Sequence, residues 1–476
     1  MRIERYLSIR KKLKELIKGT PFEGKVLFVG GCCRDELMGM EIKDIDMAVN
    51  LPLGGIRLAE WLQENRHTSR KIVTYPNYQT AMFHLKYFPD VELEAVQTRK
   101  EKYTDTQSRN PITAFGSIED DCMRRDLTIN SLYYNISTDE VVDITGHGVD
   151  DIHDHIIRTP NDPDITYDDD PLRILRCIRF ASRFGWEIEK TTYEGMVRNA
   201  DRLAIITHER IKDELDKMLT CKHTVMAMEL IRRIGAMPYV LPELVETFDM
   251  GQNEYHFGTV WEHTMAVMEK LESNQLILRM AALLHDVGKV RVRTEEGDKV
   301  HFLNHEQASA DMVDDMLRRL KYGNDFIREV QFLVKHHMSC KRWGDDCHDM
   351  KPKKLRKLQY ACGTEERFRD LMLLIDADNK AHAEDKCMLH QVEEILRQTE
   401  VMKAQGSAMF GYKLPFDGKD VMAIKGIKPG VQVKECLDYL LKLAFNNPLM
   451  EKEVMRKHLS GYKFQKSKQA NRKKKE

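Results

Sequence analysis

Residues 26–35 read Val-Leu-Phe-Val-Gly-Gly-Cys-Cys-Arg-Asp, and residues 44–49 read Asp-Ile-Asp-Met-Ala-Val. Short apolar runs rich in valine and isoleucine, such as those in both segments, predict β-strands. The first run ends at the Gly30–Gly31 pair, and Asp44 and Asp46 stand two positions apart at the start of the second. Residues two apart on a strand project from the same face, so we expect both carboxylates on one face of a sheet.

Two carboxylates held this close repel each other unless a cation lies between them. Their oxygens suit Mg²⁺, which keeps several water ligands and shares its coordination shell with substrate phosphates. Glycines allow a backbone to approach a triphosphate, and Arg34 can bind phosphate with two hydrogen bonds. A Gly-Gly turn followed by two solvated aspartates is the alternative interpretation, and either half alone favours it. The two halves occur together, each on a predicted strand, and therefore favour a metal and nucleotide site.

The residues from Gly30 to Asp35, followed by Asp44-Ile45-Asp46, resemble the active-site signature of the class II nucleotidyltransferases. This family comprises the tRNA CCA-adding enzymes and the bacterial poly(A) polymerases, within the polymerase β-like superfamily. Cys33 departs from the family pattern, which has an aliphatic residue there. The resemblance implies that Asp44 and Asp46 hold Mg²⁺ and that Gly31 and Arg34 bind the nucleotide.

Composition limits the functional classes. The chain has 476 residues, enough for two to four domains, and a formal net charge of -1 gives no evidence for nucleic-acid binding by the molecule as a whole. Any basic surface must therefore be local. The charged first 18 residues lack a signal-type apolar region, and no later stretch is long and apolar enough to cross a membrane. Ten scattered cysteines without a C-x-x-C pair indicate reduced thiols. We expect a soluble, cytoplasmic protein.

The pattern after Asp46 predicts a helix over 55–65 and strands over 72–75, 80–85 and 91–97, followed by a polar loop over 100–110. Glu94 lies in the middle of the last of these strands. The family resemblance implies that it is a third carboxylate supporting the metal pair. A solvated glutamate at a strand edge is the equally weighted alternative.

A second motif, Arg124-Arg125-Asp126, lies before a last predicted strand at 141–144. An aspartate beside two arginines can fix their side chains for contacts with ribose and phosphate oxygens. Taken alone, the motif is ordinary surface charge. It resembles the family motif that contacts the sugar of the incoming nucleotide, which implies binding by Arg125 with Asp126 beside it.

The segment 168–184 predicts a helix, with three aspartates and Pro171 at its start. Its apolar residues share one face, and four arginines without an acid share another: Arg173, Arg176, Arg179 and Arg183. Such a face indicates an anion-binding surface, and the alternative is that the arginines pair with acids of other elements. Asp170 to Arg173 resembles the base-reading element of the family, with Asp169 in place of glutamate. Residues 209–215 resemble its later helical element.

From residue 221 onward the pattern is helical throughout. The pair His285-Asp286 stands in an apolar helical segment, where it is costly to bury unless it binds something. With other histidines it resembles an HD-type metal phosphohydrolase domain over residues 251–382. The resemblance implies one divalent metal held by His263, His285, Asp286 and Asp376, or Asp378 in place of Asp376. His305 and either His336 or His337 would hold a second metal or bind phosphate.

The remaining chain, including 414–422 and 426–430, resembles the tail of tRNA nucleotidyltransferases, and 462–476 is a basic stretch. We predict an α+β fold. Its parts are a small mixed-sheet polymerase β-like head at 1–150, an all-helical neck with the base-reading element at 151–220, a helical HD body at 221–390 and a helical tRNA-binding tail at 391–476.

The resemblance implies addition of C, C and A to the 3′ end of tRNA from CTP and ATP, with release of pyrophosphate. Asp44, Asp46 and Glu94 would be catalytic, with Mg²⁺ as the cofactor and no membrane partner. Two alternatives stay open. The same motifs serve poly(A) polymerases and enzymes that add only part of the CCA end, and the HD domain could be the main activity, with an RNA-binding head.

Overall fold

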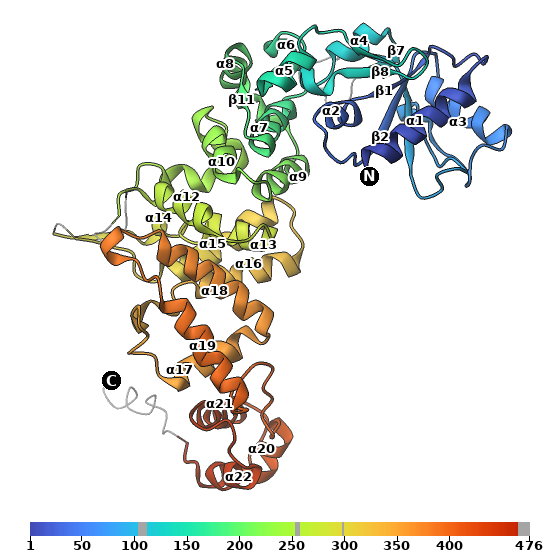
Figure 1. Ribbon diagram of the computed structural model, residues 1–476. Coiled ribbons are helices and arrows are strands. Elements are labelled where there is room, and N and C mark those ends of the chain that lie inside the picture. Colours follow the sequence, from blue (N-terminus) through green and yellow to red (C-terminus); the bar gives the residue numbers. More distant parts are fainter. Residues whose placement is uncertain (103–111, 253–257, 298, 465–476) are drawn as a thin grey trace, which may run out of the picture. The chain divides into compact units, whose positions relative to one another are not determined.

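The computed structural model describes residues 1–102, 112–252, 258–297 and 299–464 (Figure 1). Most of the loop expected at 100–110, and the basic stretch from residue 465 onward, lie outside the described residues. The chain forms two compact units, Met1–Val245 with Arg319–Lys321, and Glu246–Arg318 with Tyr322–Glu476. The expected boundary at residue 220 therefore falls inside the first unit.

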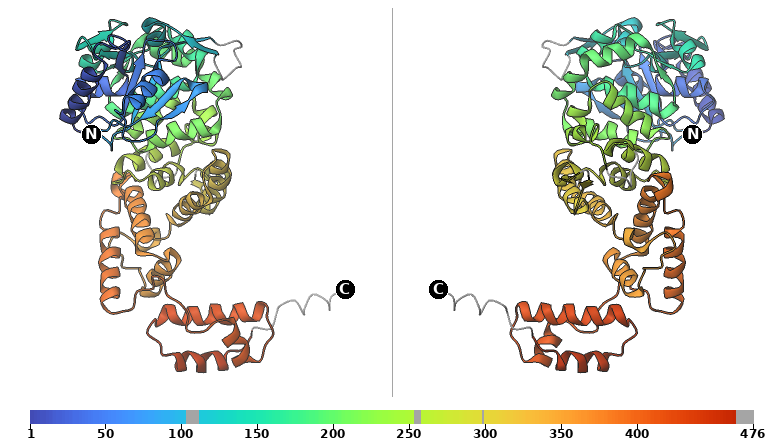
Figure 2. Two further views of the ribbon diagram at one scale, coloured as in Figure 1. Left: turned by 90° about the vertical axis from the view of Figure 1, so that its right-hand side faces the viewer. Right: turned by 90° about the vertical axis from the view of Figure 1, so that its left-hand side faces the viewer.

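A seven-stranded mixed sheet forms the centre of the head, in the order β3-β4-β5-β2-β1-β8-β9 (Figures 1 and 2). The β2–β5 pair is parallel, and the other neighbouring pairs are antiparallel. The predicted strands are present, with ends that differ by up to two residues. They are β1 (Val26–Val29), β2 (Ile45–Val49), β3 (Val73–Tyr75), β4 (Thr80–Phe83), β5 (Leu93–Gln97) and β9 (Glu140–Asp143), whereas β8 (Leu132–Asn135) was not predicted.

Both faces of β1 are buried, which explains its unbroken apolar run. Val26 and Phe28 pack with helices α1 (Ile3–Ile17) and α3 (Gly54–Glu64), whereas Leu27 and Val29 pack on the other face with Cys122 of α4 (Ile118–Met123). A strand covered on both sides cannot slip by one residue without exchanging its faces. The register that positions Asp46 is thus fixed by the core.

Two glycine positions shape this sheet. Gly30 joins β1 to α2 (Gly31–Leu37) with φ +74°, a left-handed conformation that favours glycine. Gly55 lies so close to β5 that an added Cβ would stand 2.2 Å from the Ala95 carbonyl oxygen. Helix α3 can therefore pack directly on the parallel strand pair.

Further short elements complete the head. The strands β6 (Arg99–Lys102) and β7 (Ile112–Phe115) pair with each other, partly where a loop was expected. Helix α5 (Gly148–Asp154) follows β9, and β10 (Ile156–Ile157) pairs with β11 (Glu187–Ile188).

The neck contains a helix break that the sequence interpretation did not include. Residues 168 and 169 end α6 (Pro163–Asp169), Asp170 is extended, and α7 (Leu172–Phe184) begins after Pro171. A proline disfavours the helical conformation in the residue before it, which is Asp170 here. The expectation that all three aspartates cap one helix over 168–184 is wrong. Helices α8 (Lys190–Asn199), α9 (His208–Leu219), α10 (Thr224–Arg233) and α11 (Met237–Val240) complete this unit.

Helices of the second unit enclose a buried polar cluster. They include α12 (Val260–Lys270), α13 (Leu276–Leu284), α14 (Lys289–Val292), α15 (His305–Arg319), α16 (Asn324–His336), α17 (Pro352–Cys362), α18 (Glu365–Lys380) and α19 (Gln391–Ala404). Contrary to the all-helical expectation, β12 (Thr294–Glu296) pairs with β13 (Lys299–His301).

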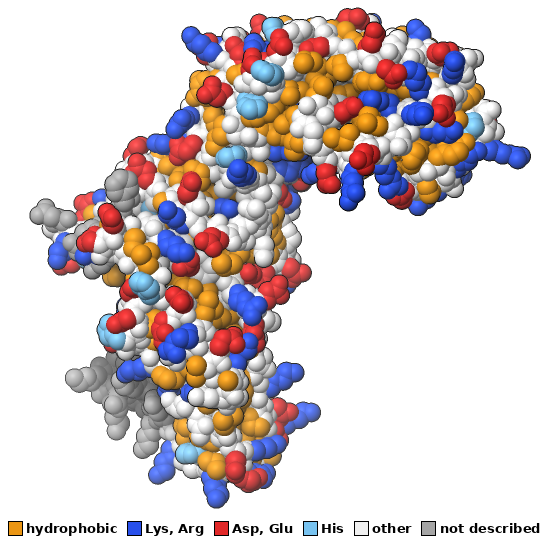
Figure 3. Space-filling model, in the orientation of Figure 1, with side chains coloured by type: hydrophobic (Ala, Val, Ile, Leu, Met, Phe, Trp, Pro, Cys, Tyr) orange, Lys and Arg blue, Asp and Glu red, His pale blue; other side chains and the backbone are white. Residues whose placement is uncertain are grey.

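A separate apolar core holds the last three helices together. It includes Val421, Leu440 and Met455. The helices are α20 (Gly418–Lys425), α21 (Val431–Asn446) and α22 (Lys452–Gly461). Among the described residues, none of the helices has both the length and the hydropathy needed to cross a bilayer. Basic and acidic side chains are mixed over the face shown in Figure 3.

Candidate functional site

Three carboxylates lie together on the head sheet. Asp46 of β2 and Glu94 of β5 are register partners in the parallel pair, and Asp44 precedes Asp46 by two residues. Burial, together with the nearby Glu94 and Asp44 carboxylates, raises the pKa of Asp46 to about 6, while Arg125 acts in the opposite direction. Burial and the charges of Glu92 and Asp44 raise the pKa of Glu94. These oxygens repel one another, and a hard divalent cation between them fits this donor set.

Arg125 lies between this cluster and the glycine turn. Its Nη1 atom is 3.5 Å from the position of a Cβ on Gly30, and its charge acts on Asp46. Asp121 accepts from Arg125 Nη2 at 3.0 Å and from the Tyr133 hydroxyl at 2.7 Å. Although burial opposes it, the Arg125 charge holds the pKa of Asp121 well below its ordinary value. Asp121 and Tyr133 were missed from sequence; the helical i,i+4 spacing of Asp121 and Arg125 was an available signal.

Arg34 and Asp126, both expected to bind nucleotide, make buried contacts within the first unit. Arg34 is 4% exposed; its Nη1 donates to Asn130 Oδ1 at 2.5 Å, and its Nη2 to Asp35 Oδ1 at 2.6 Å. Its guanidinium also stacks over the Phe180 ring of α7. Asp126 accepts from the Asn130 side-chain amide at 3.1 Å and so shares a network with Arg34. Through these contacts, Arg34 and Asp126 connect α2 with residues 126–130 and with α7.

The arginine face of α7 is largely paired with acids of other elements. Arg176 Nη2 lies 2.6 Å from Asp126 Oδ2, and Arg179 forms an ion pair with Glu214 of α9. Arg173 donates to the Thr166 carbonyl oxygen at 3.1 Å. The ion pairs of Arg176 and Arg179 therefore match the alternative that the sequence left open, in which these arginines pair with acids of other elements. Arg183 stacks over Phe184, its neighbour in the chain.

Asp170 and Arg173 were expected to belong to one base-reading element. In the structure Asp170 Oδ2 accepts from Arg210 Nη2 of α9 at 2.6 Å, and its Oδ1 accepts from the Leu172 amide at 3.1 Å. Arg173 points back to α6 instead, as its bond to Thr166 shows. The two side chains are not brought together because the extended residue before Pro171 interrupts the helical spacing. Arg210 is a site residue that the sequence interpretation placed in an element without giving it this role.

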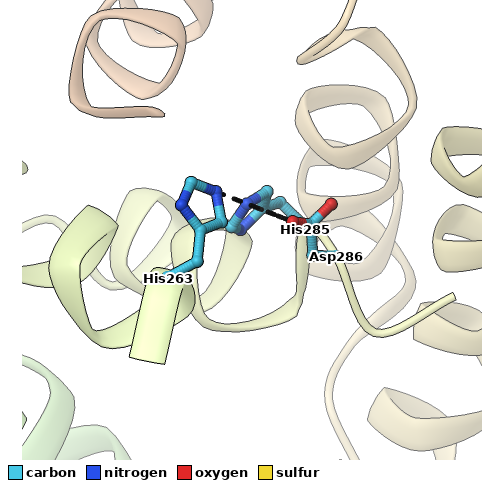
Figure 4. A group of neighbouring side chains, drawn as sticks. All are labelled: His263, His285 and Asp286. Atoms are coloured by element: carbon cyan, nitrogen blue, oxygen red, sulfur yellow. Dashed lines mark ion pairs between the residues drawn. The ribbon is translucent and has the colours of Figure 1, made fainter. Parts of the chain in front are cut away.

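In the second unit, buried imidazoles and carboxylates converge (Figure 4). Asp286 Oδ2 lies 3.2 Å from His285 Nε2 and 3.7 Å from His263 Nε2, and His263 Nε2 lies 3.1 Å from Asp378 Oδ1. On the other side of Asp286, Oδ1 lies 3.2 Å from His305 Nε2 and 3.8 Å from His337 Nε2. Asp286 thus belongs to two adjoining groups of possible metal ligands.

Contacts with backbone carbonyl oxygens fix the orientation of three of these imidazole rings. The Nδ1 atoms of His285, His305 and His337 lie 2.8, 2.9 and 2.6 Å from the carbonyl oxygens of Ala282, Phe302 and Val334. With Nδ1 at a carbonyl oxygen, each of these rings presents its Nε2 atom to the Asp286 carboxylate. Burial, followed by the charges of His285 and His305, lowers the pKa of His337 to about 3. Although burial opposes it, the charge of Asp286 raises the pKa of His285. Imidazoles together with carboxylates are donors typical of divalent transition metals, so the residue types fit a metal.

The late ligand of this cluster requires a correction. Asp378 is buried beside His263, whereas Asp376 forms a 2.6 Å ion pair with Lys380. The two aspartates are two residues apart on α18, about 200° around the helix, so only one can face the cluster. The choice of Asp376 is wrong. Of the two adjacent histidines, His337 is in the cluster, and His336 stacks on Phe332 outside it.

Three known protein families match successive segments of the chain, in the same order as the sites described above. Residues 26–158 match the poly A polymerase head domain, residues 185–247 match the "Probable RNA and SrmB-binding site of polymerase A", and residues 253–377 match the HD domain.

Two relatives align with different lengths of the chain. A tRNA nucleotidyltransferase of Schizosaccharomyces pombe is 34% identical over 48% of this chain and 47% of its own length. The chain spans about half the length of this relative. An A-adding tRNA nucleotidyltransferase of Deinococcus radiodurans is 27% identical over 88% of this chain and 91% of its own length.

The solved CCA-adding enzyme of Bacillus stearothermophilus in complex with CTP has a similar fold, with a TM-score of 0.66, 22% identity and coverage of 96% of this chain and 97% of that one. The α+β class, the mixed-sheet head and the helical remainder are thereby confirmed. The chain thus carries a poly A polymerase head domain, an RNA-binding domain and an HD domain in this order, and it is similar over most of its length to a tRNA nucleotidyltransferase.

Proposed function

We propose that this chain adds C, C and A to the 3′ end of tRNA from CTP and ATP and releases pyrophosphate. The observation that carries the proposal is the group of three carboxylates, Asp44, Asp46 and Glu94, beside the glycine turn. The similar solved structure, a CCA-adding enzyme in complex with CTP, agrees with it in its named activity and ligand, whereas the A-adding relative is named for only the last of these additions. Poly(A) addition or partial CCA addition stays the alternative, because a similar enzyme of Thermus thermophilus is CC-adding.

Asp44 and Asp46 would hold Mg²⁺, and Glu94 would add negative charge that strengthens its binding. When bound, Mg²⁺ activates the attacking 3′-hydroxyl and neutralises charge on the leaving pyrophosphate. Gly31 lets the backbone approach the triphosphate, and Arg125, held by Asp121, donates to ribose or phosphate oxygens. Four further residues would act indirectly, by holding α2 and residues 126–130 in place against α7 and α9. They are Arg34, Asp126, Arg176 and Arg179.

Asp170 would read the base. Cytosine and adenine both present an amino group that a carboxylate can accept from, whereas uracil and guanine present a carbonyl oxygen at that position. The family resemblance supports Arg173 as the donor to the ring, and the 2.6 Å contact with Asp170 supports Arg210. A carboxylate facing a carbonyl oxygen leaves two acceptors unpaired, which gives strong rejection.

We propose a second activity, metal-dependent phosphoester hydrolysis, for the HD domain. Its supporting observation is the buried cluster around Asp286, with His263, His285 and Asp378 on one side and His305 and His337 on the other. A bound divalent metal would supply a nucleophilic water and charge stabilisation. In a rival account, hydrolysis by the HD domain is the main activity, and the head only binds RNA. The three carboxylates of the head argue against it, because an RNA-binding module has no need of them.

We also propose that the protein is cytoplasmic and that the chain divides into four parts, with boundaries at residues 150, 220 and 390. All ten cysteines are free, which suits a reducing compartment.

Replacing Asp46 with asparagine should abolish nucleotide addition while the protein stays folded. The substitution removes a negative ligand, and losing several kcal/mol of transition-state stabilisation lowers the rate by about a thousandfold or more. Glu41→Gln, an exposed acid five positions earlier, is the matched control and should keep the parent rate. Incorporation of labelled nucleotide into tRNA measures both. Near-parent incorporation by a folded Asp46→Asn protein contradicts the assignment.

Replacing Asp170 with alanine should lower the preference for CTP and ATP over UTP and GTP by about tenfold or more, because the acceptor for the amino group is lost. Arg210→Ala should shift the same ratios, since Arg210 orients the Asp170 carboxylate. Arg179→Ala should weaken all four nucleotides alike. Values of kcat/KM for the four nucleotides decide this, and unchanged ratios in Asp170→Ala would show that Asp170 does not read the base.

Replacing His285 and Asp286 together with alanine should remove a bound divalent metal and phosphoester hydrolysis but spare nucleotide addition. The reason is that Asp286 contacts both groups of ligands, whereas the head has its own carboxylates. His336→Ala, next in sequence to a cluster histidine but outside the cluster, serves as the control. Metal analysis and hydrolysis of p-nitrophenyl phosphate test this. If the parent neither holds a metal nor hydrolyses the ester, the domain is structural.

A further inference from the structure

Two adjoining cavities open at the HD cluster. The first, of about 390 Å³, is lined by Lys289 and Lys341, whose ammonium groups lie 2.7 Å from Asp286 Oδ2 and 3.0 Å from Asp378 Oδ2. Its walls also include Phe302 and Met338, which offer apolar surface. A cavity of this volume suits a single nucleotide, with its phosphate near the cluster and its ring against the apolar wall.

The second cavity, of about 570 Å³, adjoins the first; both are lined by the cluster residue His305, and the other residues lining the second cavity lie outside the cluster. Phe302, Met338 and Lys341 line both cavities. The farther wall of the second cavity is formed by residues of α17 from Lys354 to Ala361 and by the short 3-10 helix Lys341–Trp343. A mononucleotide bound at the cluster would leave this space unused.

The farther wall carries uncompensated positive charge. Arg342, Lys354 and Lys357 line it, and all three are exposed. Within the described part of the chain, no carboxylate forms an ion pair with any of them. Lys354 and Lys357 are three residues apart on α17, so their side chains lie on the same side of the helix. Glu306 also lines this cavity. Several cations along an open groove match several phosphates better than one.

We propose that the HD site takes the end of a single-stranded oligonucleotide. The terminal phosphoester would lie at the cluster, and the following phosphates would lie along Arg342, Lys354 and Lys357. The proposal rests on the phosphohydrolase function proposed above. In the reaction, the oxygen of water forms a bond to phosphorus, the ester P–O bond breaks, and the departing oxygen takes a proton from the water. Water and the oligonucleotide are the only reactants.

The test compares two double variants on the same helix segment in the full-length protein. Lys354→Glu with Lys357→Glu reverses two charges in the groove. Lys351→Glu with Lys353→Glu makes the same charge change at exposed residues that line neither cavity. The substrates are a short single-stranded RNA and a mononucleotide with the same terminal phosphate, and p-nitrophenyl phosphate. The groove variant should raise KM for the RNA by about tenfold or more and leave the mononucleotide KM unchanged. The control variant should change neither KM.

A second readout does not depend on hydrolysis. In protein treated with a chelator, the RNA should protect Lys354 and Lys357 from acylation, as measured by mass spectrometry, and the mononucleotide should not. Equal KM changes for RNA and mononucleotide, or no protection, overturn the groove. If the parent hydrolyses none of the three substrates, the phosphohydrolase function is wrong, and protection alone then decides whether the groove binds RNA.

Discussion

The repulsion between the Asp46 and Glu94 carboxylates is the constraint around which the head is built. The parallel pairing of β2 with β5 sets these residues opposite each other, and burial makes their charges more costly. The sheet maintains this arrangement because both faces of β1 are packed and α3 lies directly against β5 through Gly55. A divalent cation between the carboxylates would relieve that repulsion, and Arg125 supplies a fixed positive charge near Asp46.

Buried charges of the same kind connect the head to the neck and organise the HD domain. Asp126 pairs with Arg176 of α7, and the Arg34 guanidinium lies against the Phe180 ring of the same helix. These two contacts hold α2 and Asp126 of the head against α7 of the neck. Removing one partner of such a pair leaves an uncompensated buried charge, which costs about 3–5 kcal/mol. In the HD cluster, positive charge and hydrogen-bond donors likewise surround buried carboxylates: Lys289 pairs with Asp286, and Lys341 pairs with Asp378. The two sites thus use one physical principle with different donor atoms.

The local parts of this arrangement could be predicted from sequence, and the long-range parts could not. Strand periodicity placed Asp46 on a strand with Asp44 two residues before it, and the apolar run around His285 and Asp286 indicated a buried polar site. Glu94 stayed open because its partner strand lies almost fifty residues away in sequence. The pairing of Arg179 with Glu214, and of Asp170 with Arg210, depends on how α7 and α9 pack. Asp378 was placed second to Asp376 because helical spacing alone does not say which face is buried.

The account is tested most directly by the products formed on tRNA transcripts that end at the discriminator base, before any of the CCA end. Purified protein would receive a divalent cation with each nucleotide alone and with all four together, and the extended 3′ ends would be sequenced. The account predicts addition of C, C and A in that order, followed by a stop. Continued addition of A to any RNA, a product that lacks either C or A, or no incorporation at all would contradict it.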